Sequence, residues 1–359
     1  MEEKNETKSE IIAVGSNSLV RTSRAIEITN KLLDESKFQF IGDFKGETVW
    51  KINAHSQAVR KIIFLQNFNQ IISAGEEGFI KFWNSETGKL ISEFQIENNW
   101  ITALASCKCS PINFIPETNF LFCAGKSGNI HRVVIDDLDE GFSYKTIKAH
   151  ELIIQDISVS KSNKLIASCS WDDKISIWNT ESLECQTTFL AHNLGANSIE
   201  FINEENLIVS GGKDEKIKVW QSSGELITEL SGHKHWVEAV TYCPSKNILA
   251  SGCCDNTIKI WNWQDEKCLL TIINDEWIND LVFSEDGNYL IATCYNATIK
   301  VFETKNFTQI AIYSEHSKTF PFHHSIKREA TNWIYSLLFD NSSKNIFSAS
   351  VDGCIYKWK

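Results

Sequence analysis

Three side chains in one short stretch have the composition of a hydrolase triad. His150, Ser170 and Asp172 are of the types that supply a general base, a nucleophile and a carboxylate that orients the base. In α/β-hydrolases the nucleophilic serine sits on a sharp turn between a strand and a helix. Ser170 instead lies within a predicted strand. We therefore expect these three residues to have a structural role and expect no catalytic residue in the chain.

Cysteine pairs suggest a metal site only weakly. Zinc sites commonly use CxxC pairs, with a second pair at a matched distance. Cys107 and Cys109 are separated by one residue, whereas Cys253 and Cys254 are adjacent. Cysteines in the predicted second strands are better explained as small buried apolar residues. His316, His323 and His324 lie close together in an insert, but their spacing is not typical of a metal site.

No cofactor is expected either. A phosphate-binding loop needs the sequence Gly-Lys-Ser/Thr after a glycine-rich turn, and the stretch GGKDEK (211–216) lacks it. The chain has 35 Lys and Arg against 46 Asp and Glu, which gives a net charge of −11. This charge argues against binding to nucleic acid or to an anionic membrane, because either partner would need a positive field.

The cysteine count and the first residues bear on the compartment. The chain has 11 cysteines in 359 residues, and its first ten residues are polar, without the apolar stretch of a signal peptide. We expect reduced thiols and a cytoplasmic protein, with a nuclear location as an alternative. At 42% hydrophobic and 23% charged residues, the composition is that of a globular protein.

An internal repeat determines the expected architecture. The stretches IKFWN, ISIWN, IKVWQ, IKIWN and IYKWK place tryptophan at 83, 178, 220, 261 and 358. Val133 and Phe302 occupy the same position in two further units, so that seven units follow one another at a spacing of 41 to 56 residues. Each unit contains short runs of β-branched and aromatic residues separated by Gly, Asn and Asp. A period of about 40–45 residues with a terminal aromatic is typical of propeller blades.

The motif within each unit resembles that of the WD-repeat family of β-propellers. Repeat five contains Gly232-His233, the apolar Val237, then Asp255 and Trp261 in the order and spacing of the family motif. The resemblance covers about residues 44–359 and implies an all-β, seven-bladed propeller. Signalling scaffolds of this family that bind protein kinase C share an insert before the last blade and a degenerate sixth blade. Repeat two is degenerate here as well, so the subfamily stays open.

The resemblance implies a hydrogen-bond network of His, Ser, Asp and Trp inside each blade. Only repeat three is expected to have all four, as His150, Ser170, Asp172 and Trp178. Repeats one, four and five are expected to lack the serine, because Gly75, Gly212 and Cys253 stand at its position. Repeats two and six lack the His, the Asp and the Trp.

The ends of the repeat array predict how the ring closes. The chain ends at Lys359, directly after the third strand of the seventh unit, which leaves that unit one strand short. Residues 45–55 match the fourth-strand stretch that leads into each histidine, and we expect them to complete the last blade. Residues 1–22 are expected to be disordered, residues 23–43 to form a short helical or irregular segment on the propeller, and residues 44–359 to form the propeller.

Aromatic residues outside the core motif point to one face. Trp100, Trp236, Trp277 and Trp333 each directly precede the apolar residue that begins the first strand. Trp171 and Tyr295 occupy the turn between second and third strands, and Tyr335 follows the apolar residue of repeat seven. The geometry of a four-stranded blade places these connections on one face, hereafter the top face. Polar residues expected on it are Arg60, Gln155, Asp173, Asn197, Lys213, Glu238 and Asn279.

Exposed aromatic clusters with a polar rim mark protein interfaces. The sequence therefore favours a non-enzymatic scaffold or adaptor that binds a protein or peptide on the top face, as a monomeric propeller within a larger assembly. One alternative is a substrate receptor or regulatory subunit of a ligase or kinase assembly. Another is that each tryptophan caps its own loop and was copied when the repeat was duplicated.

Overall fold

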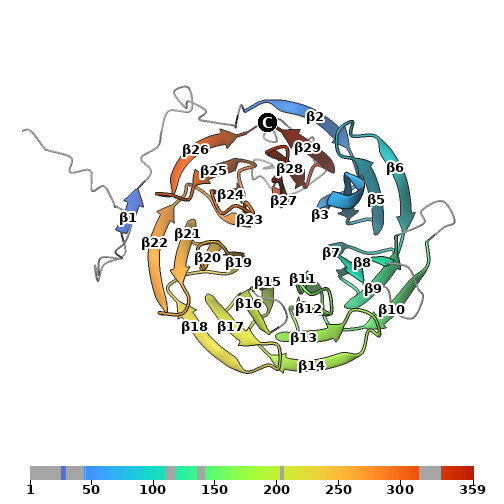
Figure 1. Ribbon diagram of the computed structural model, residues 1–359, viewed down its shortest axis with the longest axis horizontal. Coiled ribbons are helices and arrows are strands. Elements are labelled where there is room, and N and C mark those ends of the chain that lie inside the picture. Colours follow the sequence, from blue (N-terminus) through green and yellow to red (C-terminus); the bar gives the residue numbers. More distant parts are fainter. Residues whose placement is uncertain are drawn as a thin grey trace, which may run out of the picture.

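The computed structural model shows seven antiparallel β-sheets arranged as blades around a central channel (Figure 1). It describes residues 26–29, 44, 46–109, 118–135, 142–202, 206–314 and 333–359. The all-β, seven-bladed propeller predicted from the repeat is confirmed. Within the described ranges, no helix is long and apolar enough to cross a membrane.

In blades one to six the four strands from the channel outward follow chain order. Blades one to four consist of β3 (Val59–Leu65), β4 (Gln70–Gly75), β5 (Phe79–Asn84) and β6 (Leu90–Gln95); β7 (Ile101–Cys109), β8 (Thr118–Gly125), β9 (Asn129–Val134) and β10 (Tyr144–Lys148); β11 (Ile154–Val159), β12 (Leu165–Ser170), β13 (Lys174–Asn179) and β14 (Cys185–Leu190); and β15 (Ala196–Phe201), β16 (Leu207–Gly212), β17 (Lys216–Gln221) and β18 (Leu226–Ser231). A short 3₁₀ helix, η2 (Gln66–Phe68), joins β3 to β4.

Blades five to seven follow the same plan. They consist of β19 (Val237–Cys243), β20 (Ile248–Cys253), β21 (Thr257–Asn262) and β22 (Lys267–Ile273); β23 (Ile278–Phe283), β24 (Tyr289–Cys294), β25 (Ile299–Glu303) and β26 (Thr308–Tyr313); and β27 (Ile334–Asp340), β28 (Asn345–Ser350), β29 (Cys354–Trp358) and β2 (Thr48–Asn53). The chain therefore supplies the outer strand of the last blade from its N-terminal part, and β2 lies beside β29 in the ring (Figure 1).

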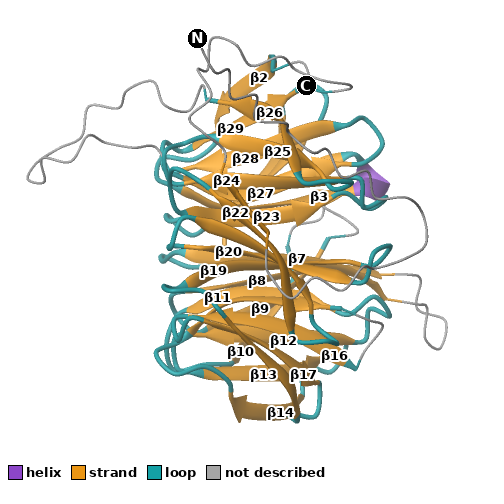
Figure 2. Cartoon of the chain, turned by 90° about the vertical axis from the view of Figure 1, so that its left-hand side faces the viewer, coloured by secondary structure: helices purple, strands orange, loops and turns teal. Residues whose placement is uncertain are grey.

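The hydrophobic core lies between neighbouring blades. Strand β12 in the middle of blade three is buried at all six positions, whereas the outer strand β14 alternates between exposed and partly buried residues. One apolar cluster joins Ile177 of blade three to Phe201 and Trp220 of blade four. Because both faces of the middle strands are covered in this way, each blade depends on its two neighbours. Figure 2 shows the ring from the side, with the strands of the blades one above another.

Residues 26–29 form a strand, β1 (Ile26–Thr29), rather than part of the short helical or irregular segment expected for residues 23–43. Strand β1 pairs in parallel with β22 and extends blade five to five strands (Figure 1). The sequence IEIT is rich in β-branched residues, which favour strands. The outer edge of β22 also offers unpaired backbone groups to such a strand. The rest of the 1–43 region, including the predicted disorder of residues 1–22, lies outside the described residues.

Candidate functional site

The residues that resemble a hydrolase triad belong to a buried hydrogen-bond network, but with a different serine. His150 Nδ1 donates to the carboxylate of Asp172 at 3.1 Å, and His150 Nε2 lies 2.8 Å from Ser168 Oγ. Trp178 Nε1 donates to the same hydroxyl at 3.0 Å. Ser170 takes no part: its Oγ accepts from the Asp172 amide and donates to the Leu152 carbonyl. The assignment of Ser170 to the network is therefore wrong.

The strand register gives the physical reason. In the β12–β13 ladder Ile166 is opposite Trp178, so the indole reaches the hydroxyl two residues further along, on the same face. Ser168 and Ser170 share that face, but Ser170 lies at the end of the strand beside the turn. The sequence signal that identifies the correct serine is its position ten residues before the tryptophan, which recurs in five units at Ser73, Ser168, Ser210, Ser251 and Ser348.

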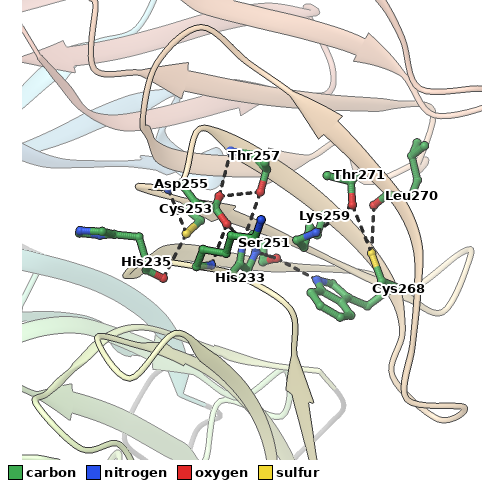
Figure 3. A network of polar contacts seen from close by, with 12 residues as sticks. His233, His235, Ser251, Cys253, Asp255, Thr257, Lys259, Cys268, Leu270 and Thr271 are labelled. Carbon is green, nitrogen blue, oxygen red and sulfur yellow. Dashed lines mark hydrogen bonds and ion pairs between the residues drawn. The ribbon is translucent and has the colours of Figure 1, made fainter. Parts of the chain in front are cut away.

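The expectation that only repeat three has all four residues is wrong for the same reason. Blades one, four and five contain the complete network, with distances of 2.6 to 3.0 Å; its members are His55, Glu77, Ser73 and Trp83; His192, Asp214, Ser210 and Trp220; and His233, Asp255, Ser251 and Trp261. Figure 3 shows the blade-five network, in which Thr257 also bonds to Asp255. Blade seven retains Ser348 and Trp358, joined at 2.8 Å.

Glycine stands at the position of Ser170 in two other blades, and this has a steric explanation. In blades one and four this position holds Gly75 and Gly212, and an added Cβ would lie 2.4 Å from a ring atom of His55 or His192. The position lies directly against the imidazole. In blades one and four the close approach of the histidine therefore favours glycine, whereas blades three and five hold Ser170 and Cys253 at this position; the hydroxyl of the network lies one pleat deeper.

The electrostatics of the networks favour a neutral imidazole and an ionised carboxylate. Burial lowers the pKa of His192 and of His233, and this outweighs the opposite effect of their aspartates. Burial opposes ionisation of Asp172, yet the hydrogen bond from His150 lowers its pKa to about 2. The neutral ring donates from Nδ1 and accepts at Nε2 from the serine. Ser168 is fully buried between an imidazole and an indole, where no substrate reaches it.

We expect the Ser168→Ala variant to lose about 1–3 kcal/mol of unfolding free energy, because His150 and Trp178 lose their shared partner in the interior. Ser170→Ala serves as the matched control and should lose less, since it removes only bonds to the backbone at the strand end. Urea unfolding of both variants measures the difference. A larger loss for Ser170→Ala would contradict the assignment of Ser168.

The top face is built by one hydrogen bond repeated in every blade. The residue at the turn between second and third strands donates its amide to the carbonyl of the residue that precedes the innermost strand, at 2.9 to 3.1 Å. This bond brings together the two positions at which the sequence places its aromatic residues. The seven pairs are Glu76 with Ala58, Lys126 with Trp100, Trp171 with Ile153, Lys213 with Gly195, Cys254 with Trp236, Tyr295 with Trp277, and Val351 with Trp333.

Side chains at these positions touch one another across the blades and form a continuous arc. Ring centroids lie 4.1 Å apart for Tyr295 and Trp333, 4.9 Å for Trp277 and Tyr295, and 5.3 to 6.1 Å for the other contacts of the series, which joins Trp236, His235, Trp277, Tyr295, Trp333 and Tyr335. We call these rings, together with Trp100 and Trp171, the aromatic arc.

Cations extend the arc at both ends. The Arg60 guanidinium lies between Trp100 and Tyr335, at 4.7 and 4.1 Å from the ring centroids, and is paired with Glu76. At the other end the Lys213 ammonium lies 3.3 Å from the ring centroid of Trp171 and 4.8 Å from that of Trp236. Desolvation lowers the pKa of Lys213. A cation over an indole face is attracted by the ring quadrupole, so these contacts hold the rings in place.

The structure thus brings together the aromatic residues predicted for the top face, with Arg60 and Lys213 beside them. Asp173 lies in the same β12–β13 turn as Trp171, with φ of 70°, and its carbonyl accepts from the amides of Ala191 and His192. Trp171, Trp236 and Trp277 are 40%, 42% and 38% exposed. Gly195 permits the Trp171 indole to lie across it, since a Cβ there would be 3.1 Å from the ring. The sequence interpretation missed two members of this surface. His235 lies against Trp236 and Trp277, and the Lys126 ammonium lies over the ring of Trp100.

Below the arc, polar side chains join the innermost strands around the channel. Asp156 accepts from the amide of Ile199, Ser198 from that of Val240, and Asp280 from that of Leu337, each in the next blade. These bonds satisfy amides on the inner strand edges, which have no further strand to pair with. Lys61 lies 3.3 Å from Asp156 and compensates part of the carboxylate charge.

Glu200, on the innermost strand of blade four, should give the fold an unusual pH dependence of stability. Burial raises its pKa to about 7, although its carboxylate accepts from the Tyr242 amide. A raised pKa in the folded state stabilises the fold at low pH, and this contribution is lost as pH rises through about 7. Relative to Glu200→Gln, the wild-type chain should therefore lose about 2–3 kcal/mol between pH 5 and pH 8.5. Urea titrations at both pH values test this, and a constant difference would contradict the raised pKa.

One group of side chains has the composition of a metal site. Ligand atoms of His233, Cys253 and Asp255 lie within 4.8 Å of one another. The His233 nitrogens are bonded to Asp255 and Ser251, and burial raises the pKa of the Cys253 thiol well above its usual value. Since both His233 nitrogens already have partners, the geometry serves the blade-five network (Figure 3). His316, His323 and His324 lie outside the described residues.

Comparison with known proteins agrees with the repeat. The sequence profile of the family described as "WD domain, G-beta repeat" matches residues 46–84, 141–179, 183–221, 224–262, 266–303 and 314–359. Small ribosomal subunit protein RACK1 of Candida albicans is 42% identical over 146 residues, which are 40% of this chain and 44% of that protein. Human pre-mRNA-processing factor 17 is 29% identical over 124 residues, 34% of this chain and 20% of its own length.

A third relative is the guanine nucleotide-binding protein subunit beta of Saccharomyces cerevisiae. It is 24% identical over 160 residues, which cover 42% of this chain and 36% of the relative. The chain therefore spans less than half the length of each of these relatives. The profile covers most of the seven blades and leaves out residues 85–140, which contain the first three strands of blade two, where Val133 stands in place of the motif tryptophan.

Proposed function

Because the chain belongs to the WD-repeat family of β-propellers, we propose that it is a non-enzymatic scaffold that binds a protein or peptide segment on its top face. Members of this family act in general as interaction modules, and the relatives above are named as a ribosomal subunit protein, a pre-mRNA-processing factor and a guanine nucleotide-binding protein subunit. Two of the three residues that could have supplied catalysis, His150 and Asp172, are engaged in a buried network with Ser168, whereas Ser170 bonds only to the backbone.

The aromatic arc is the observation that carries the proposal. Three of its indoles are exposed by about two fifths of their surface, although each is held in a defined position by a ring or cation neighbour. Rigid aromatic side chains that stay exposed in the free protein offer a large apolar area at low entropic cost, which is typical of interface hot spots. A tryptophan that only caps its own loop would need contacts within its own blade alone, whereas the rings of the aromatic arc contact rings of neighbouring blades.

The thiols support a reducing compartment. Ten of the cysteines are free, and eight of these ten are buried. Free thiols persist in the cytoplasm and the nucleus, where glutathione keeps them reduced. We place the proposed scaffold there.

Capture of partners from an extract of the source cells tests the proposal. The wild-type chain, Trp236→Ala/Trp277→Ala and Trp263→Ala would be used as baits side by side. Trp263 lies in the turn between β21 and β22, at the opposite end of its blade, and bonds to Asn247. We expect Trp263→Ala to retain the partners and the double variant to lose them. Retention of every partner by the double variant, with a normal melting temperature, would contradict top-face binding.

A further inference from the structure

A second ring lies inside the aromatic arc, at the mouth of the channel. All seven innermost strands have a register shift directly after their first residue, so that one residue of each bulges out of the ladder. The bulged residues line one cavity of about 260 Å³. This mouth ring consists of Arg60, Thr102, Gln155, Asn197, Glu238, Asn279 and Tyr335.

Most polar members of the mouth ring already have strong partners. Arg60 is paired with Glu76 and lies between two rings. Asn197 accepts from Trp171 Nε1 at 3.0 Å and donates to the Val237 carbonyl, and Asn279 donates to the Ile334 carbonyl. Such bonds fix the shape of the ring and leave these side chains little capacity for a ligand.

Glu238 differs from its neighbours. The one hydrogen bond that the structure gives its carboxylate comes from the Cys254 thiol, a weak donor, at 3.4 Å. Among the described residues, no cationic nitrogen lies within 4 Å of it. The positive charge of Lys213 acts on it, but the Lys213 ammonium is held over two indoles. Burial raises the pKa of Glu238, because its charged form lacks a partner.

The remaining charges of the cavity also favour a cation. Asp156 and Asp280 lie deeper and are committed to backbone amides, with Lys61 beside them. The cavity lining therefore holds three carboxylates against Arg60 and Lys61. With the neighbouring Glu76 and Lys213 included, four carboxylates stand against three cations. The Trp171 indole, part of the same lining, offers a flat surface to a guanidinium or an ammonium group.

We propose that the mouth ring binds a cationic side chain, arginine or lysine, of the partner segment, with its head group paired to Glu238. This inference rests on the proposed top-face function and names its partner chemistry. Arginine fits better, because a guanidinium is planar, weakly hydrated and stacks on indole. Insertion of one cation also fixes the register of a segment that lies along the aromatic arc.

The pairing has a defined pH dependence. A bound cation favours the ionised form of Glu238, so binding releases a proton and strengthens as pH rises from 5 to 7.5. Cys254 and Lys213 face Glu238, and Arg60, Lys61, Asp156 and Asp280 share the cavity. Burial raises the pKa of Asp280 as well. The Glu238→Gln variant is therefore needed to assign the pH effect.

The test uses the full chain and small probes. N-acetyl-arginine methylamide, its lysine counterpart and the neutral isostere N-acetyl-citrulline methylamide are titrated, with tryptophan fluorescence and calorimetry as readouts. We expect the arginine probe to bind at least tenfold more tightly than the citrulline probe at pH 7.5. The preference should disappear in Glu238→Gln and persist in Glu151→Gln, which removes the same charge from an exposed position in the blade-three loop. A lysine probe that binds as well as arginine would still support a cation site.

Equal binding of the arginine and citrulline probes to the wild-type chain would overturn the inference without use of any variant. So would an undiminished arginine preference in a Glu238→Gln chain that melts normally. Partner capture separates the two proposals. If Glu238→Gln retains the partners that Trp236→Ala/Trp277→Ala loses, the top face binds them without a cation in the mouth ring, and only the inference fails.

Discussion

Removal of residues 1–53 should abolish the cooperative unfolding of the propeller and lead to aggregation. The deletion takes away β2, the outer strand of blade seven, and leaves the edge of β29 unpaired. It also removes Trp50 and Ile52 from the apolar cluster between blades seven and one, and Phe44, 1% exposed, from the cluster between blades six and seven. Because each blade rests on both neighbours, an incomplete blade seven weakens the whole ring.

A shorter deletion provides the control. Removal of residues 1–25 leaves β1, Phe44 and β2 in place, and the melting temperature should change little. Calorimetry and light scattering of the two truncated chains distinguish the outcomes. A soluble 54–359 chain with a single sharp transition near that of the full chain would show that β2 does not hold the ring closed.

The architecture could be predicted because its signal is repeated. Seven units with one spacing define the blades even where Val133 and Phe302 replace the tryptophan, since the neighbouring units supply the period. The closing strand could be predicted as well, because residues 45–55 match the fourth-strand stretch of the other units, and the structure pairs β2 with β29. The order of the strands depends on many residues at once, and the repeat spacing therefore predicts it even where single motif residues differ.

Finer details depended on single contacts and were harder to predict. Ser168 and Ser170 lie on the same strand face, and only the ladder register decides which one meets Trp178. The strand at Ile26–Thr29 depends on an edge offered by β22, far away in sequence. His235 joins the arc because it lies between Trp236 and Trp277 of adjacent blades, a contact that no spacing rule within one repeat describes.

The loss of two indoles from the aromatic arc should have the second large effect, on binding. Trp236 and Trp277 are partly exposed and belong to none of the apolar clusters between blades, so their truncation leaves the core intact. An indole in an interface hot spot contributes about 2 kcal/mol, which is roughly thirtyfold in affinity. Both rings contact His235, so the two effects are coupled, and we expect a combined loss of about a hundredfold or more.

The dissociation constant of a captured partner, measured for the wild-type chain and for Trp236→Ala/Trp277→Ala together with both melting temperatures, tests the central claim most directly. The account predicts that the dissociation constant rises about a hundredfold while the melting temperature changes by less than about 2 °C. An unchanged dissociation constant in a double variant that melts early would contradict it, since the indoles would then be caps of their own loops.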